Sequence, residues 1–97
     1  MRLRKYPPVH PGKILKKEFM DVFGLRAIAL AKGLGVPRGR ISEILQGKRA
    51  LSPETALRLH FFFGNSAEFW MNLQIRYDLK QETLRSGDRL ARDVTPF

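Results

Sequence analysis

The sequence predicts a compact all-α domain of five helices. Apolar residues recur at helical spacing in five segments, glycines and prolines separate these segments, and no stretch alternates with the period of two that indicates a strand. The chain has 97 residues, which suits a single domain with one modest core. Within it we expect a basic N-terminal arm at 1–9, a helical domain at 10–85 and a C-terminal tail of weak periodicity at 86–97.

Two helices are predicted in the first part of the chain. The first spans 11–23, because Pro11 suits a first helical turn and Gly24 suits a helix end. Its expected apolar face comprises Leu15, Phe19, Val22 and Phe23. The second spans 26–34 and is ended by Gly35. Its expected inner face comprises Ile28, Ala31 and Leu34.

The third and fourth helices follow after short connections. The third spans 37–46, and its expected inward residues are Ile41, Ile44 and Leu45. The fourth spans 53–63, since Ser52 is a good N-cap and the proline after it is a good first residue. Its expected core residues are Ala56, Leu59 and Phe63.

The fifth helix is predicted from 65 to about 85. Asn65 and Glu68 resemble a capping box at its start. An aromatic stripe runs along it, heavier than a small core requires, and so predicts a homodimer interface made by Phe69, Trp70, Leu73 and Tyr77. The alternative, left open by the sequence, is that these residues cover the core of their own domain.

The segment 27–46 meets the demands of a helix-turn-helix. Ala31 is small enough for two helices to cross, and Gly35, four residues later, permits a left-handed turn. Ile41 and Ile44 bury the inner face of the second helix and leave its outer face free for a major groove. An ordinary helical hairpin is the alternative.

The outer face of the helix at 37–46 is therefore the predicted DNA contact. Arginine pairs bidentately with guanine, so Arg38 and Arg40 are the strongest candidates. Gly39 would let the helix approach closely, and Glu43 would accept from cytosine. The full set of expected contacts is Arg26, Lys32, Arg38, Gly39, Arg40, Ser42, Glu43, Gln46, Lys48 and Arg49. Any single member could equally be a solvated surface residue.

The distribution of charge agrees with a nucleic-acid partner. The formal net charge is +9, and residues 1–49 carry 12 basic and 3 acidic side chains whereas residues 50–97 carry 6 of each. A field concentrated in one half of the chain attracts phosphates and releases counterions. The other explanation is a basic surface that simply maintains solubility.

Three segments of the chain together resemble a known family. HPGKILKKEF (10–19), ALAKGLGVPRGRISEILQGKRALSPETALRL (29–59) and GNSAEFWMNLQIRYDL (64–79) are similar to the HigA-type antitoxins, or plasmid-maintenance antidote proteins, of the Xre helix-turn-helix superfamily. The resemblance covers 6 to about 80. It implies a five-helix, lambda-repressor-like fold, a homodimer, repression of the protein's own operon on double-stranded operator DNA, and neutralisation of a HigB-type toxin, an mRNA-cleaving ribonuclease.

The chain also departs from that family. Arg26 and Ala27 stand where the family usually has Ser or Asn followed by Gln, a phosphate-contacting pair, and Gly33 replaces a usual alanine. Two rival functions stay open: a stand-alone repressor without a toxin, and a protein-interaction domain whose DNA site has decayed. The toxin-binding surface is also open between the arm (Arg2, Arg4, Lys5, Tyr6), the first helix and the tail.

Several other classes of protein are not expected. The chain has no cysteine, and its two histidines, His10 and His60, stand fifty residues apart, so we predict no metal site, no cofactor and no enzymatic activity. No apolar run reaches the roughly 18–20 residues that span a bilayer, and no signal peptide is evident. A cytoplasmic protein is the expectation.

Overall fold

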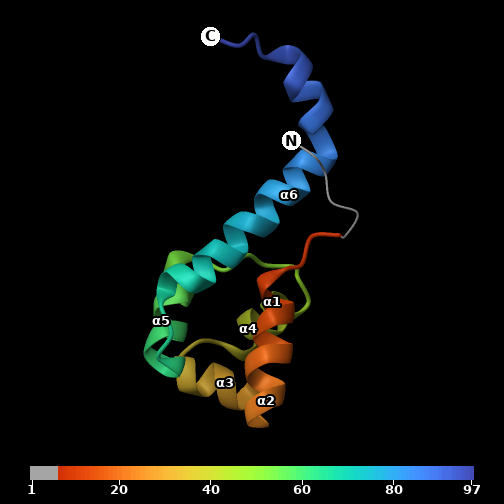
Figure 1. Cartoon of the computed structure of the whole chain (residues 1–97). Helices are drawn as coiled ribbons and strands as arrows, with labels where there is room; N and C mark the ends of the chain where they lie inside the picture. Colours follow the sequence, from red (N-terminus) through yellow and green to blue (C-terminus); the bar gives the residue numbers. More distant parts are fainter. Residues whose placement is uncertain (1–6) are drawn as a thin grey trace.

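The protein was analysed as a computed structural model that describes residues 7–97 (Figure 1). Most of the predicted N-terminal arm, including Arg2, Arg4, Lys5 and Tyr6, lies outside the described residues. All regular secondary structure among the described residues is helical, which confirms the all-α prediction. Its elements are α1 (Pro11–Ile14), η1 (Leu15–Met20), α2 (Asp21–Phe23), α3 (Ala27–Leu34), α4 (Arg38–Leu45), α5 (Pro53–Phe63) and α6 (Ala67–Asp93).

The first three elements form one continuous helix with a π-helical stretch, η1, in its middle. A π-helix bonds each residue to the one five positions on, so Leu15 and Met20 point inward together and are both buried. The same change in spacing turns Val22 and Phe23 outward, each 66% exposed. The predicted inner face of this helix was therefore wrong at its C-terminal end.

The core lies between this first helix, α3, α4, α5 and the start of α6. Its side chains are Leu15, Met20, Leu30, Ala31, Leu34, Ile41, Ile44, Leu51, Ala56, Leu59 and Trp70. Most of the predicted inward residues are among them. Ile28 is not, because the buried face of α3 centres on Leu30 and leaves Ile28 60% exposed.

Gly12 allows the first helix to cross the end of α4 at unusually short range. A Cβ atom at this position would lie 1.9 Å from the carbonyl oxygen of Ile44 and 3.1 Å from Cα of Leu45. Both of those atoms belong to the backbone, which cannot rotate aside as a side chain does. The close packing of α4 against the first helix therefore requires a residue with no side chain at position 12.

The turn between α3 and α4 is closed as the sequence predicts. Gly35 has φ of 72°, in the left-handed region, and Val36 N–H donates to the carbonyl of Ala31 over 3.0 Å. One residue earlier, Arg58 of α5 donates from Nη1 to the carbonyl of Leu34 over 2.8 Å. The C-terminus of α3 is thus tied to its own turn and to α5.

The packing of α3 against α5 explains why position 33 is a glycine. A Cβ atom on Gly33 would lie 2.4 Å from a ring atom of Phe62. The aromatic side chain of α5 occupies the space that an alanine methyl would need, and so the glycine that weakens α3 accommodates that ring.

Side-chain hydrogen bonds cap the N-termini of α5 and α6. Ser52 caps α5 as predicted, and its hydroxyl accepts from Thr55 N–H over 3.2 Å. The cap of α6 is Ser66, which accepts from Phe69 N–H, so the prediction of Asn65 as the cap was wrong. The side-chain Oδ1 of Asn65 instead accepts from the indole N–H of Trp70 over 3.0 Å, because the buried indole needs a polar partner.

The last helix is longer than its periodicity predicts. α6 continues to Asp93, so most of the expected loose tail at 86–97 is helical. Figure 1 shows its C-terminal half running away from the other helices. With 27 residues it is about 40 Å long, and the weak amphipathic pattern of its C-terminal half agrees with a segment that runs away from the other described helices.

His10 caps the first helix with a titratable side chain. Its Nδ1 accepts from Gly12 N–H over 2.9 Å, which caps α1. Burial lowers the pKa of His10, and a backbone hydrogen bond with Arg49 and the charge of Asp78 oppose this only in part. Because the folded-state pKa lies below the unfolded value of about 6.5, the stabilisation is complete above that pH and is lost as the pH falls through the folded pKa.

We therefore expect the free energy of unfolding to fall between pH 7 and pH 5 in urea titrations. His10→Asn retains a capping side chain that cannot titrate, and it should flatten this part of the pH profile. A profile unchanged by His10→Asn would mean that another group causes the acid sensitivity.

Candidate nucleic-acid interface

α3, the turn at Gly35 and α4 together form a helix-turn-helix. Ile41 and Ile44 of α4 are fully buried, and Ala31 of α3 is almost fully buried where the two helices cross. This anchoring leaves the opposite side of α4 uncovered by any described residue. Arg38, Gly39, Glu43 and Gln46 are exposed there, whereas Arg40 and Ser42 are half-buried.

The N-termini of both helices lack a side-chain cap. Arg26 precedes α3 and Pro37 precedes α4, and neither side chain accepts from the first helical turn. First-turn N–H groups without such a partner can donate to a phosphate oxygen, and the helix dipole favours the negative charge. Arg26 provides no capping oxygen for α3. Its guanidinium can instead bind a phosphate placed at the N-terminus of that helix.

Four of the predicted basic contacts are exposed and unpaired. Arg26, Lys32, Arg38 and Lys48 form no ion pair with any of residues 7–97. Gly39 has no atom within 4 Å of the position of a Cβ, so the surface above it is open. These side chains keep their full charge for an external partner.

Two other predicted contacts are paired with carboxylates. Arg49 Nε lies 2.7 Å from Glu43 Oε1, so Glu43 already has a cationic partner on the surface predicted to read bases. Arg40 Nη1 lies 3.4 Å from Oε1 of Glu54, at the start of α5. The two recognition-helix arginines thus differ, because Arg38 is unpaired and Arg40 leans towards α5.

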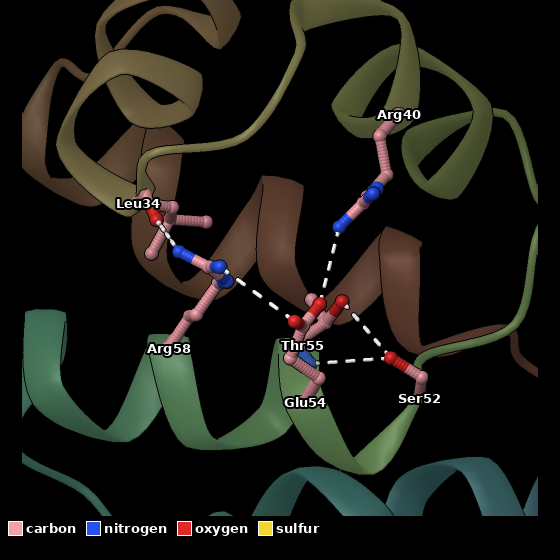
Figure 2. A network of polar contacts seen from close by, with 6 residues as sticks. All are labelled: Leu34, Arg40, Ser52, Glu54, Thr55 and Arg58. Carbon is pink, nitrogen blue, oxygen red and sulfur yellow. Dashed lines mark hydrogen bonds and ion pairs between the residues drawn. The ribbon is translucent and has the colours of Figure 1, made fainter.

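Figure 2 places Arg40 within a small polar network. Glu54 receives Arg40 on one oxygen and Arg58 on the other, with Arg58 Nη2 3.6 Å from Glu54 Oε2. Arg58 also reaches the end of α3 through the Leu34 carbonyl. Ser52 and Thr55 complete the first turn of α5 beside them. The network joins α3, α4 and α5.

The aromatic stripe on α6 mostly serves its own domain. Trp70 is 0% exposed and contacts Phe19, with ring centroids 4.8 Å apart, so the prediction that it lines a dimer interface was wrong. Leu73 is half-buried against the core, and Tyr77 packs edge-on against His10. Only Phe69 is substantially exposed.

Both the candidate DNA surface and the surface of α6 include residues that were not predicted from the sequence. Glu54 and Arg58 carry no motif of their own, and only their spacing of four residues hints at an ion pair. On α6, Ile75, Leu79 and Leu90 are exposed and follow one another by four and eleven residues. These intervals are close to one and three helical turns, so the three side chains lie along one side of α6.

No group of three histidine, aspartate or glutamate side chains among residues 7–97 is arranged to hold a metal ion. No helix in that range combines the length and the apolar character needed to cross a membrane.

Comparisons with known proteins place this geometry in a family. A helix-turn-helix family profile matches residues 17–70. Virulence-associated protein I of Dichelobacter nodosus is 49% identical over 74 residues, which cover 76% of this chain and 68% of that protein. An addiction module antidote protein of the HigA family from Coxiella burnetii is 43% identical, with a TM-score of 0.91 over 95% of this chain and all of that chain.

A third relative was solved with nucleic acid. The Pseudomonas aeruginosa antitoxin HigA, in a structure with the higBA promoter, is 37% identical, with a TM-score of 0.90 over 93% of this chain and 98% of that one. These likenesses extend over nearly the whole described fold, well beyond the helix-turn-helix. The chain therefore belongs to the helix-turn-helix family of non-enzymatic DNA-binding regulators, within its HigA-type antitoxin branch.

Proposed function

We propose that this protein is the antitoxin and autorepressor of a type II toxin–antitoxin pair. As a homodimer it binds the operator of its own operon, and it neutralises a HigB-type, mRNA-cleaving toxin. The observation that carries the DNA-binding part is the open outer face of α4, where Arg38 is exposed and unpaired above a fully buried Ile41 and Ile44. A relative solved with its promoter supports the same assignment.

In this proposal Arg38 and Gly39 meet base edges, and Lys48 meets the phosphate backbone just beyond α4. Arg26 and Lys32 meet the flanking strand from α3. Basic side chains supply affinity for any duplex, and contacts to base edges supply preference among sequences. The remaining predicted contacts lie on the same face: Arg40, Ser42, Glu43, Gln46 and Arg49.

Single alanine substitutions separate these two roles. Arg38→Ala should weaken operator binding by roughly 1–3 kcal/mol and leave non-operator binding less affected. Lys48→Ala should weaken all duplexes alike and reduce the slope of log affinity against log salt by about one. Fluorescence anisotropy at several salt concentrations measures both quantities.

The matched control is Lys80→Ala, a half-buried cation on α6 that lies outside the helix-turn-helix. It should change neither the affinity nor the salt slope. If Arg38, Arg40 and Lys48 are replaced together and operator binding survives unchanged, the DNA-binding proposal fails and a protein-interaction domain is the better explanation.

A second subunit is part of the proposal because one helix-turn-helix contacts only a few base pairs. Useful affinity requires two half-sites about one helical turn apart. The apolar line Ile75, Leu79 and Leu90 on α6 is exposed in the single chain, and the C-terminal half of α6 runs away from the other described helices (Figure 1). We propose it as the surface where two copies meet.

Toxin neutralisation is tested separately from DNA binding. Co-expression with the small protein encoded beside this gene should restore growth that the partner alone arrests. A partner that is harmless alone, or one that still arrests growth in the presence of this protein, would reduce the function to that of a stand-alone repressor. Operator binding measured on the same preparation stays informative in either case.

A further inference from the structure

The two arginines of the recognition helix are held differently, although both point away from the core. Arg38 is exposed and has no ion-pair partner among residues 7–97. The side chain of Arg40 is 32% exposed, and its Nη1 lies 3.4 Å from Glu54 Oε1. Arg38 therefore has no fixed partner before DNA binds, whereas Arg40 has a defined one.

Glu54, the partner of Arg40, is itself held in place by Arg58. Glu54 Oε2 lies 3.6 Å from Nη2 of Arg58, and Arg58 Nη1 donates to the carbonyl of Leu34 over 2.8 Å (Figure 2). The Leu34 carbonyl is a fixed backbone group at the end of α3. The carboxylate that receives Arg40 is therefore anchored to the same frame that carries the recognition helix.

A carboxylate in this position opposes non-specific DNA binding. Non-specific affinity comes almost entirely from cations that replace counterions at phosphates, and a cation already paired with a carboxylate contributes less to it. At the operator, an arginine that is already held in position binds with a small loss of conformational entropy, because fewer side-chain rotamers must be given up. The pair thus lowers affinity for random DNA more than affinity for an operator.

We infer that Glu54 is a positioning residue that determines specificity: it holds Arg40 and so raises the ratio of operator to non-operator affinity. This inference rests on the proposed DNA-binding function and extends it to a residue outside the helix-turn-helix. A purely structural explanation is that Glu54 stabilises the first turn of α5 through the helix dipole. That role would change the thermal midpoint and leave the affinity ratio unchanged.

The test is Glu54→Gln in the full-length protein, with affinities measured for operator and for random duplex at several salt concentrations. Non-operator affinity should rise about three- to fivefold, which is the range of an exposed ion pair. Its salt slope should steepen by about one counterion. Operator affinity should rise less or fall, so the affinity ratio should drop about threefold.

Two further variants assign the effect to the pair. In an Arg40→Gln background, Glu54→Gln should leave the affinity ratio unchanged. Glu68→Gln removes an exposed glutamate from the first turn of α6, the same helical position in a helix that takes no part in the polar network around Arg40, and it should change nothing.

Several results would overturn the inference. Equal shifts of operator and non-operator affinity would mean that Glu54 acts only as local negative charge. A ratio that drops equally without Arg40 would exclude action through that arginine. If the wild-type protein binds no operator at all, the proposed function has failed instead, and the two failures are thus distinguishable.

Discussion

Gly12→Ala is expected to destabilise the protein by about 3 kcal/mol or more, a large part of the total stability of a small domain. The added methyl group would lie 1.9 Å from the carbonyl oxygen of Ile44 and 2.8 Å from its carbonyl carbon. Neither atom can move without displacing the backbone of α4, so the first helix and the recognition helix must separate. Urea unfolding followed by circular dichroism measures the loss.

The matched control is Gly39→Ala in α4. A Cβ atom on Gly39 meets nothing within 4 Å, and alanine is the better helix former by about 1 kcal/mol. This variant should be as stable as the wild type or more so. If it nevertheless binds operator less tightly, the added methyl group reports a close approach of DNA to α4. Equal stability of the two alanine variants would contradict the packing argument for Gly12.

Patterns that repeat along the chain were sufficient to predict most of the fold. The apolar spacing and the glycine at position 35 located α3 and α4, because helical periodicity and the left-handed turn are local properties. Ser52 identified the start of α5 for the same reason. Ile41 and Ile44 were predicted to be buried and are, since the geometry of two crossing helices leaves few alternatives.

Features that depend on distant contacts were not predictable in this way. The π-helical stretch η1 changes which residues face inward, and nothing in the spacing of its apolar residues indicates it. Gly12 and Gly33 owe their roles to Ile44 and Phe62, which lie about thirty residues further along the chain. The full burial of Trp70 depends on the neighbouring helices, so an aromatic stripe alone could not separate core from interface.

The candidate DNA surface was likewise predictable only in part from the sequence. Arg38, Gly39 and Lys48 were identified from their place on or just after a recognition helix, and all three are exposed. The pairing of Arg40 with Glu54 was not, because the two residues are fourteen positions apart and meet only when α5 packs beside α4. Sequence patterns therefore predict which helix contacts DNA, and the packed structure distinguishes its arginines.

Replacing Leu79 and Leu90 together with glutamine is expected to convert a dimer into a monomer and to lower operator affinity by about 10² or more. The two side chains are 64% and 40% exposed, and the C-terminal half of α6 runs away from the other described helices (Figure 1). Glutamine is a good helix former without charge, so the fold and the electrostatic attraction to DNA should be retained. Without the apolar contact the two subunits separate. Binding of one subunit to its half-site then no longer raises the effective concentration of the other subunit at the second half-site.

Leu84→Gln provides the control, because Leu84 is also exposed but lies nine residues from Ile75 and hence on the opposite side of α6. Sedimentation velocity should give a monomer for the Leu79/Leu90 variant and a dimer for the Leu84 variant, with matching operator affinities. A half-site duplex should bind the wild type and the Leu79/Leu90 variant about equally, since each recognition helix is unchanged. If the double variant stays dimeric, the two copies must meet on another surface, and the exposed Phe69 would be the next residue to replace.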